Sequence, residues 1–245
     1  MLFQMCYGPE IRSMFECLIK EPGLTAIELK EKYQYQNNGD IKSLVDSVVV
    51  FLKELSLIEQ RQEMNYVTTS EWSTSDMFRR LNEISRKGNP DSLNYVFASL
   101  YETFFVKPDK LFVSNLHYQV NSLNGKAMVG HEKVNAWKRI MECYGLGRRV
   151  YSGFYALPRF ELLIEIIREV GFWEGPLHQY CEKFINPIIP CITTEGNVFR
   201  GLLYGLNALN EKKVIEIKNK QDLPFKSYGP EYNWNWITTK FEGAQ

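Results

Sequence analysis

A helix that leads directly into a β-hairpin is the pattern that most constrains this chain, because it occurs near both ends. The first copy has apolar residues at helical spacing over 41–55, followed by strand-like segments at 57–60 and 66–69. The second copy has a helix over 198–210, a strand at Lys213–Ile217 and a return strand over 234–239. The two ends are therefore predicted to be similar small units that combine helices with a hairpin.

Two further helices precede the first hairpin. Residues 9–20 have a helical apolar stripe, and Thr25 begins a second helix as part of a Thr25-x-x-Glu28 capping box. Three helices and a hairpin are the element order of a winged helix, and the helix-to-strand junction around Leu57-Ile58-Glu59 is similar to the junction before the wing in that superfamily. The predicted fold class is mainly α with small β-hairpin wings (α+β), arranged as tandem winged-helix-like units that flank a helical middle domain.

The predicted domains are an N-terminal winged-helix-like domain (1–72), a helical middle domain (73–156) and a C-terminal winged-helix-like domain (157–245). The middle domain is expected to contain about four helices, one of them over Phe112–Leu123. In the C-terminal domain, residues 171–176 are expected to form a turn.

Composition favours a cytoplasmic protein. The five cysteines include no Cys-x-x-Cys pair, the N-terminus lacks the pattern of a signal peptide, and no apolar run approaches the roughly 18 residues of a membrane span. Aromatic residues make up 14% of the chain, which fits either several small cores or an interaction surface. The formal net charge is +0, so the local distribution of charge has to decide whether nucleic acid is a partner.

The N-terminal unit lacks the cations of a DNA-reading helix. Residues 24–69 contain five lysines and arginines against seven acids, a net charge of −2, and the third helix has no arginine. Binding to a phosphate backbone requires several cations that face the phosphates. Protein contact or dimerisation is therefore the favoured role of this unit, ahead of reading the major groove.

The basic residues gather in the middle and at the second hairpin. Residues 126–159 contain seven cations against two acids, a net charge of +5, and residues 198–240 contain seven against four, a net charge of +3. These cations could follow a DNA backbone. A solvated basic face and a solubilising hairpin tip are the alternatives. The candidate DNA-binding residues are Lys138, Arg139, Arg148, Arg149, Lys212, Lys213, Lys218 and Lys220.

No catalytic or metal-binding motif is recognisable. His178-x-x-Cys181 places two potential ligands on one helical face, but only the isolated Cys191 follows, whereas zinc requires a tetrahedral set. No nucleophile elbow, phosphate-binding glycine loop or metalloprotease motif occurs. The expectation is a protein that is not an enzyme and uses no metal or cofactor.

Short motifs resemble winged-helix accessory proteins encoded in bacterial anti-phage defence and DNA-modification islands. They are Tyr7-Gly8-Pro9 with the later Leu57-Ile58-Glu59, Val134-x-x-Trp137, Gly145-Leu146-Gly147 and Leu157-Pro158. The resemblance implies a non-catalytic subunit that works beside a larger ATPase or nuclease. It carries over no functional residues.

Three functions are consistent with these patterns. The first is a DNA-associated adaptor that contacts the duplex backbone without sequence specificity and binds a larger protein partner or a second copy of itself. The second is a purely structural subunit that uses both winged units for protein contacts. The third is a winged-helix transcription regulator, which would require a dimer that recognises a palindromic site. None of the three requires a membrane.

Overall fold

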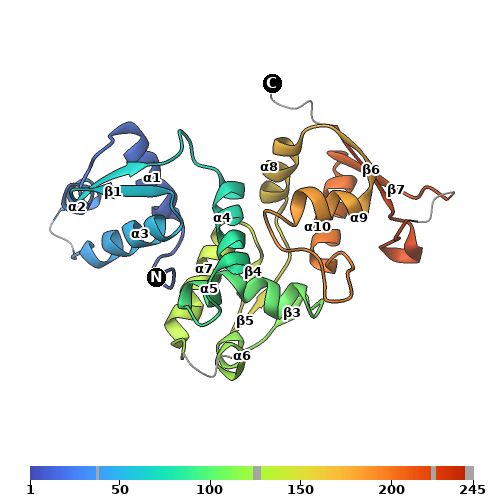
Figure 1. Cartoon of the computed structure of the whole chain (residues 1–245), viewed down its shortest axis with the longest axis horizontal. Helices are drawn as coiled ribbons and strands as arrows, with labels where there is room; N and C mark the ends of the chain where they lie inside the picture. The colour runs from blue at the N-terminus through green and yellow to red at the C-terminus, as the bar shows by residue number, and fades with distance from the viewer. Residues whose placement is uncertain (37–38, 124–127, 222–224, 241–245) are drawn as a thin grey trace. The chain divides into compact units, whose positions relative to one another are not determined.

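The computed structural model describes residues 1–36, 39–123, 128–221 and 225–240. The chain forms two compact units, which are described separately. Unit 1 comprises Met1–Ala98 and His117–Tyr144, and unit 2 comprises Ser99–Leu116 and Gly145–Gln245. Helices alternate with small antiparallel sheets, which confirms the predicted α+β class with its helices and β-hairpins (Figure 1).

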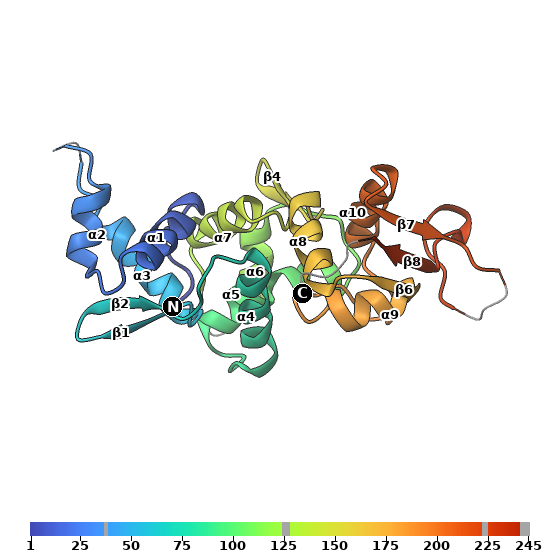
Figure 2. The same ribbon diagram turned by 90° about the horizontal axis from the view of Figure 1, so that it is seen from above.

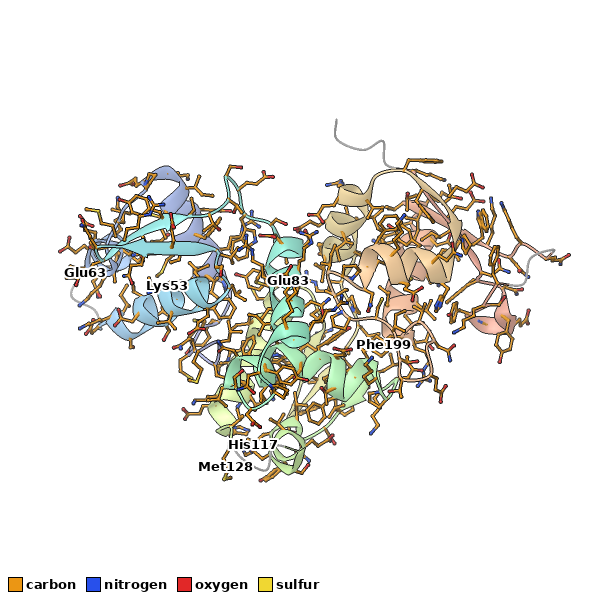
Figure 3. The ribbon with its side chains drawn as sticks, in the orientation of Figure 1. Lys53, Glu63, Glu83, His117, Met128 and Phe199 are labelled. Carbon is orange, nitrogen blue, oxygen red and sulfur yellow. The ribbon has the colours of Figure 1, made fainter. Side chains whose placement is uncertain are left out.

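Unit 1 begins with three helices and a hairpin. They are α1 (Pro9–Lys20), α2 (Ala26–Tyr33), α3 (Lys42–Glu54), β1 (Ile58–Arg61) and β2 (Met64–Val67). The predicted capping box at Thr25 and Glu28 is present at the start of α2. The hairpin turn consists of Gln62 and Glu63, both with positive φ, which is the geometry of a tight two-residue turn. β1 and β2 lie side by side in Figure 2, and Figure 3 labels Glu63 at their tip.

A short extended segment completes this small sheet. The amide of Gly23 donates to the carbonyl of Asn65 at 2.9 Å, and the amide of Asn65 donates to the carbonyl of Leu24 at 3.1 Å. The segment therefore pairs with β2 on the side away from β1. The helices close over a buried core in which Phe15 and Phe51 are fully enclosed.

The rest of unit 1 is helical. It contains α4 (Thr74–Lys87), the start of α5 (Leu93–Tyr101), nearly all of α6 (Leu116–Leu123) and α7 (His131–Cys143). Trp137 of α7 is 1% exposed, and its indole Nε1 donates to the carbonyl of Phe97 at 3.0 Å. Phe97 also packs edge-on against Phe3, with ring centroids 5.1 Å apart. Trp137 and Phe97 thus join α7, α5 and the N-terminal segment in one core.

Unit 2 contains both of the three-stranded sheets. Its strands are β3 (Phe112–Val113), β4 (Arg148–Val150), β5 (Gly153–Tyr155), β6 (Trp173–Pro176), β7 (Ile215–Lys218) and β8 (Trp236–Thr239). Its helices beyond α5 are η1 (Glu102–Val106), α8 (Phe160–Val170), α9 (Leu177–Tyr180), η2 (Cys181–Ile185), α10 (Arg200–Glu211) and η3 (Pro230–Tyr232). The sheet orders are β3-β5-β4 and β6-β8-β7, and every pairing is antiparallel.

Two predictions from local sequence are wrong. Phe112 and Val113 form a strand, not the start of a helix, because they pair with β5 and Asn115 adopts a positive φ before α6 begins. Residues 171–176 contain β6 in place of the expected turn, since Trp173–Pro176 pairs with β8. In both cases the partner strand lies about forty or more residues later in the sequence. The middle segment, predicted as a helical domain of about four helices, contains α4, α5, α6 and α7, together with the β4–β5 hairpin, for which the sequence predicts no strand.

Both ends of the chain share one connectivity. In unit 1 the order is α1, the extended segment, α2, α3, β1 and β2, with β2 paired on both sides. In unit 2 the order is α8, β6, α9 with η2, α10, β7 and β8, with β8 as the central strand. In unit 2, the fully buried Phe199 immediately precedes α10 and is labelled in Figure 3.

Unit 2 also contains a repeated local motif that the sequence analysis did not detect. Tyr101-x-x-x-Phe105-Val106-x-Pro108 and Tyr180-x-x-x-Phe184-Ile185-x-Pro187 have the same pattern, and each contains a π-helical turn, η1 or η2. The amides of Lys107 and Asn186 each donate five residues back, at 2.8 Å. The tyrosine and phenylalanine rings of each copy are in contact, with centroids 5.9 Å and 5.5 Å apart.

Asn235 organises the connection between β7 and β8, and its removal is expected to destabilise the second sheet. Its side chain is 3% exposed, donates to Asn219 Oδ1 at 2.8 Å and to the carbonyl of Lys220 at 3.1 Å, and accepts from the amide of Lys220 at 2.8 Å. Asn235→Ala leaves these groups without their partner and should lower the free energy of unfolding by about 1–3 kcal/mol. Urea unfolding followed by circular dichroism measures the change, and the exposed Asn233→Ala is the matched control.

Candidate nucleic-acid interface

Arg148 and Arg149 lie on β4, an edge strand of the β3-β5-β4 sheet. β4 and β5 form a hairpin, which can be located by the label of β4 in Figures 1 and 2. Gly147 allows the strands to approach, because a Cβ there would lie 2.1 Å from the carbonyl oxygen of Tyr155. The chain reverses at Tyr151, which has a positive φ and a fully exposed side chain. Both arginine side chains are exposed.

One face of this sheet carries aromatic rings and a guanidinium in a row. Tyr155 on the central strand pairs with Phe112 of β3 on one side and Arg148 of β4 on the other. Directly paired residues of an antiparallel sheet project to the same face. The rings of Phe112 and Tyr155 are in contact, with centroids 4.6 Å apart and planes inclined by 33°. Both aromatic side chains are more than a third exposed, at 38% and 37%.

The other face of the sheet is core. Phe154 is fully buried and packs edge-on against Phe105 of η1, with ring centroids 5.7 Å apart. Val113, its partner on β3, is buried as well. The buried face fixes the strands, so the exposed residues on the opposite face have a rigid support. We call Phe112, Arg148, Tyr151 and Tyr155 the β4–β5 platform. Arg149 is exposed on the same edge strand, but it pairs with Phe154 and therefore projects toward the opposite face.

The platform has a positive electrostatic character. Arg148 is its only charged residue, and the three strands with the connecting turn contain no aspartate or glutamate. Cationic and aromatic side chains on one surface are the combination by which proteins hold phosphate backbones and bases.

Lys138 and Arg139 occupy different environments on α7. Lys138 is 4% exposed, because it lies one helical turn after buried Val134 and shares its face. A buried ammonium cannot contact a phosphate, so the structure does not support Lys138 as a DNA-binding residue. Arg139 is half-buried, with its guanidinium 4.7 Å from the centroid of the Tyr7 ring. Both residues belong to unit 1, whereas the platform belongs to unit 2.

Lys212 and Lys213 follow the last turn of α10 and are both exposed. The ammonium of Lys212 lies 4.8 Å from the centroid of the Phe160 ring, a cation–π contact at the surface. Lys213 has a positive φ and connects α10 to β7. Both remain accessible to an anionic partner.

Lys218 and Lys220 are held by acidic neighbours. Lys218 forms an ion pair with Glu216 at 3.4 Å, and Lys220 forms one with Glu174 at 3.4 Å. Lys220 also lies over the ring of Trp236, with its Nζ 3.6 Å from the centroid. The indole of Trp236 donates to the same Glu174 at 3.3 Å. The ammonium groups of Lys218 and Lys220 are therefore each paired with a carboxylate of the protein.

Removing Lys218 and Lys220 is expected to change DNA affinity little. In the variant Lys218→Ala with Lys220→Ala, the lost cations are already paired with glutamates, so we expect less than about a threefold loss of affinity, well below the effect of losing phosphate contacts. Fluorescence anisotropy with a labelled duplex measures the affinity. A loss of tenfold or more would show that these two lysines contact the DNA.

The residues with catalytic or metal-binding potential are scattered over the structure, hydrogen-bonded to other side chains, or buried. Across the described ranges, no three histidine, cysteine, aspartate or glutamate side chains are grouped so that they could hold a metal ion. His178 Nδ1 lies 2.5 Å from Tyr228 Oη, and burial lowers the pKa of His178 and raises that of Tyr228 to about 12. Burial also raises the pKa of the Cys181 thiol well above its usual value, which keeps it protonated and unreactive.

Of the helices in the part of the chain that the structure describes, none combines the length and apolar character needed to span a bilayer. Comparison with protein-family models, curated proteins and solved structures finds no match for this chain. The support for the candidate site therefore comes from its geometry in this structure.

Arg148 of the platform is a candidate from the sequence, but the aromatic residues of the platform are not. The sequence predicts a helix over Phe112–Leu123 and indicates no role for Tyr151 or Tyr155. The signal that could have found them is the segment 148–155, in which Arg-Arg-Val and Gly-Phe-Tyr flank a Tyr-Ser turn. It has the strand–turn–strand composition of a short hairpin.

Proposed function

We propose that this protein is a non-catalytic, DNA-associated adaptor that contacts the phosphate backbone through the β4–β5 platform. The observation that carries the proposal is the exposed Arg148 beside the Phe112–Tyr155 ring pair, on a rigid sheet whose strands contain no acidic residue. Backbone contact of this kind is independent of base sequence. The protein would thus bind DNA without selecting a site.

We further propose that both ends of the chain are winged-helix-like units. Their shared order of helix, strand, helix, helix and hairpin, with the last strand central, is the connectivity of winged-helix domains. In such domains the third helix enters the major groove when DNA sequence is read. The corresponding helices here are α3 and α10.

Neither α3 nor α10 is equipped to read bases. The exposed charges of α3 are Lys42, Asp46 and Lys53, which nearly cancel. On α10, Arg200 is fixed by Asp109, which accepts from its Nε at 2.7 Å and from its backbone amide at 3.0 Å. This supports backbone contact from the hairpin in preference to the sequence-specific binding of a transcription regulator.

The salt dependence of binding tests the proposal. We expect the protein to bind duplexes of unrelated sequence with similar affinity, and the logarithm of the binding constant should fall linearly with the logarithm of salt concentration. Each neutralised phosphate contributes a slope of about −0.9. Anisotropy titrations at several salt concentrations measure this slope. No binding at low salt would refute the DNA contact.

A purely structural subunit is the second candidate, and exposed apolar residues of unit 1 favour it. Ile27 of α2 is 69% exposed and Tyr35, just beyond α2, is 75% exposed. Exposed apolar side chains of this kind are enriched at protein interfaces. Co-purification with a large partner together with no affinity for DNA would support this alternative.

The partner and the compartment belong to the same proposal. The resemblance to winged-helix accessory proteins of anti-phage islands is the basis for a larger ATPase or nuclease as partner, and self-association remains an alternative. The five cysteines carry free thiols in the structure, which fits a reducing cytoplasm. Size-exclusion chromatography with light scattering distinguishes a monomer from a homo-oligomer.

A further inference from the structure

We propose that the β4–β5 platform binds unpaired nucleotides, with a base stacked on the Phe112–Tyr155 ring pair and a neighbouring phosphate held by Arg148. The inference deepens the proposed function and rests on it, because it uses the same arginine. It assigns the ligand as single-stranded nucleic acid, or an unpaired stretch of a duplex, in place of continuous double helix.

The ring pair is suited to stacking because it is exposed and held in place. Phe112 and Tyr155 lie on adjacent strands with their centroids 4.6 Å apart, and each exposes more than a third of its side chain. The strands beneath them are anchored by Phe154 in the core. A base that stacks on this pair therefore meets side chains that lose little freedom on binding.

Gly153 keeps the Phe112 ring close to the sheet. A Cβ at position 153 would lie 2.5 Å from two ring carbons of Phe112 and 2.6 Å from the carbonyl oxygen of Val113. The absence of a side chain there lets the ring lie across β5, next to Tyr155. Gly153 thus makes room for the two rings to lie next to each other on the sheet.

The charges of the platform favour a nucleic acid over an apolar protein segment. An apolar partner would cover Arg148 without supplying an acceptor, and burying an unpaired guanidinium is costly. A nucleotide strand supplies a ring face for Phe112 and Tyr155 and phosphate oxygens for Arg148. Continuous duplex supplies only the phosphates, since its bases are stacked on one another.

Removal of the bases, with the phosphates kept, is the direct test. Full-length protein is titrated with an oligo-dT strand of about 16 nucleotides, the upper range covered by one small single-strand-binding domain. An oligo-U strand, an abasic strand of the same length and a duplex are titrated in parallel. We expect the oligo-dT or oligo-U strand to bind about five- to a hundredfold more tightly than the abasic strand, the range that one stacked base provides.

The variant Phe112→Leu with Tyr155→Leu keeps apolar bulk and removes both rings. It should lose most of the preference for strands with bases while retaining the affinity for the abasic strand. Phe172→Leu is the matched control, because Phe172 is 65% exposed and lies outside the platform. Circular dichroism melting shows that both variants are folded.

The outcomes separate the two proposals. Equal binding of strands with and without bases by the wild type, or an unchanged preference in the double variant, overturns the stacking proposal. If duplex and abasic strands still bind with a normal salt slope, the backbone contact of the proposed function survives. If no nucleic acid binds at low salt, both proposals fail.

Discussion

Charge reversal of both hairpin arginines, Arg148→Glu with Arg149→Glu, is expected to weaken binding to duplex DNA by at least about tenfold, and to the same extent on unrelated sequences. Both side chains are exposed on one edge strand, Arg148 on the face of the ring pair and Arg149 toward the opposite face. Their loss should make the salt slope shallower by about one to two units, since each phosphate contact contributes about −0.9. Anisotropy titrations over a range of salt concentrations measure both quantities.

A matched control variant distinguishes the effect of losing this site from the effect of changing the net charge of the protein. Lys53→Glu with Arg61→Glu changes the formal charge by the same amount, but both residues belong to unit 1 and their side chains are exposed. This variant should keep most of the wild-type affinity and slope. An equal loss in both double variants would show that overall charge, not the β4–β5 platform, determines binding.

Trp137→Ala is expected to lower the free energy of unfolding of unit 1 by roughly 3–5 kcal/mol. The indole is almost completely buried, and its Nε1 donates to the carbonyl of Phe97. The substitution creates a large cavity between α7 and α5 and leaves that buried carbonyl without its donor. Urea denaturation followed by far-ultraviolet circular dichroism measures the loss.

An exposed aromatic residue of the same unit provides the control for Trp137. Tyr118 of α6 is 73% exposed, and Tyr118→Ala should change stability by less than about 0.5 kcal/mol. If Trp137→Ala costs no more than Tyr118→Ala, then Trp137 does not form the centre of the unit 1 core.

The helices near the N-terminus could be predicted from the sequence because their signals are local. The capping box of Thr25 and Glu28 lies within one helical turn, and the apolar stripe of α1 repeats every three to four residues. The bounds of α1 are the same in the sequence and in the structure. Each of these helices forms its hydrogen bonds within its own segment.

The short strands of unit 2 could not be predicted in the same way. β3 has only two residues, and its partner β5 follows about forty positions later. Trp173–Pro176 contains a glycine and a proline, which favour a turn, yet it pairs with β8 more than sixty residues away. Pairing across such distances overrides local propensity.

The candidate site was predicted in part for the same reason. Arg148 and Arg149 could be found from charge alone, but their aromatic neighbours come from β3 and β5 and meet only when the sheet forms. The buried position of Lys138 follows from its spacing to Val134, which the charge count ignored. Charge counts identify cations, whereas pairing and burial decide which of them face outward.

The two π-helical turns have a consequence for how the chain tolerates changes in length. A π-turn is equivalent to an α-helical turn with one residue inserted, so η1 and η2 each rotate the segment beyond them by about 100° relative to a continuous α-helix. Deleting the exposed Thr103 would restore α-helical geometry and turn Pro108 and β3 out of alignment with β5. A single-residue deletion there should therefore be far more harmful than one in an exposed loop, although it removes no buried side chain.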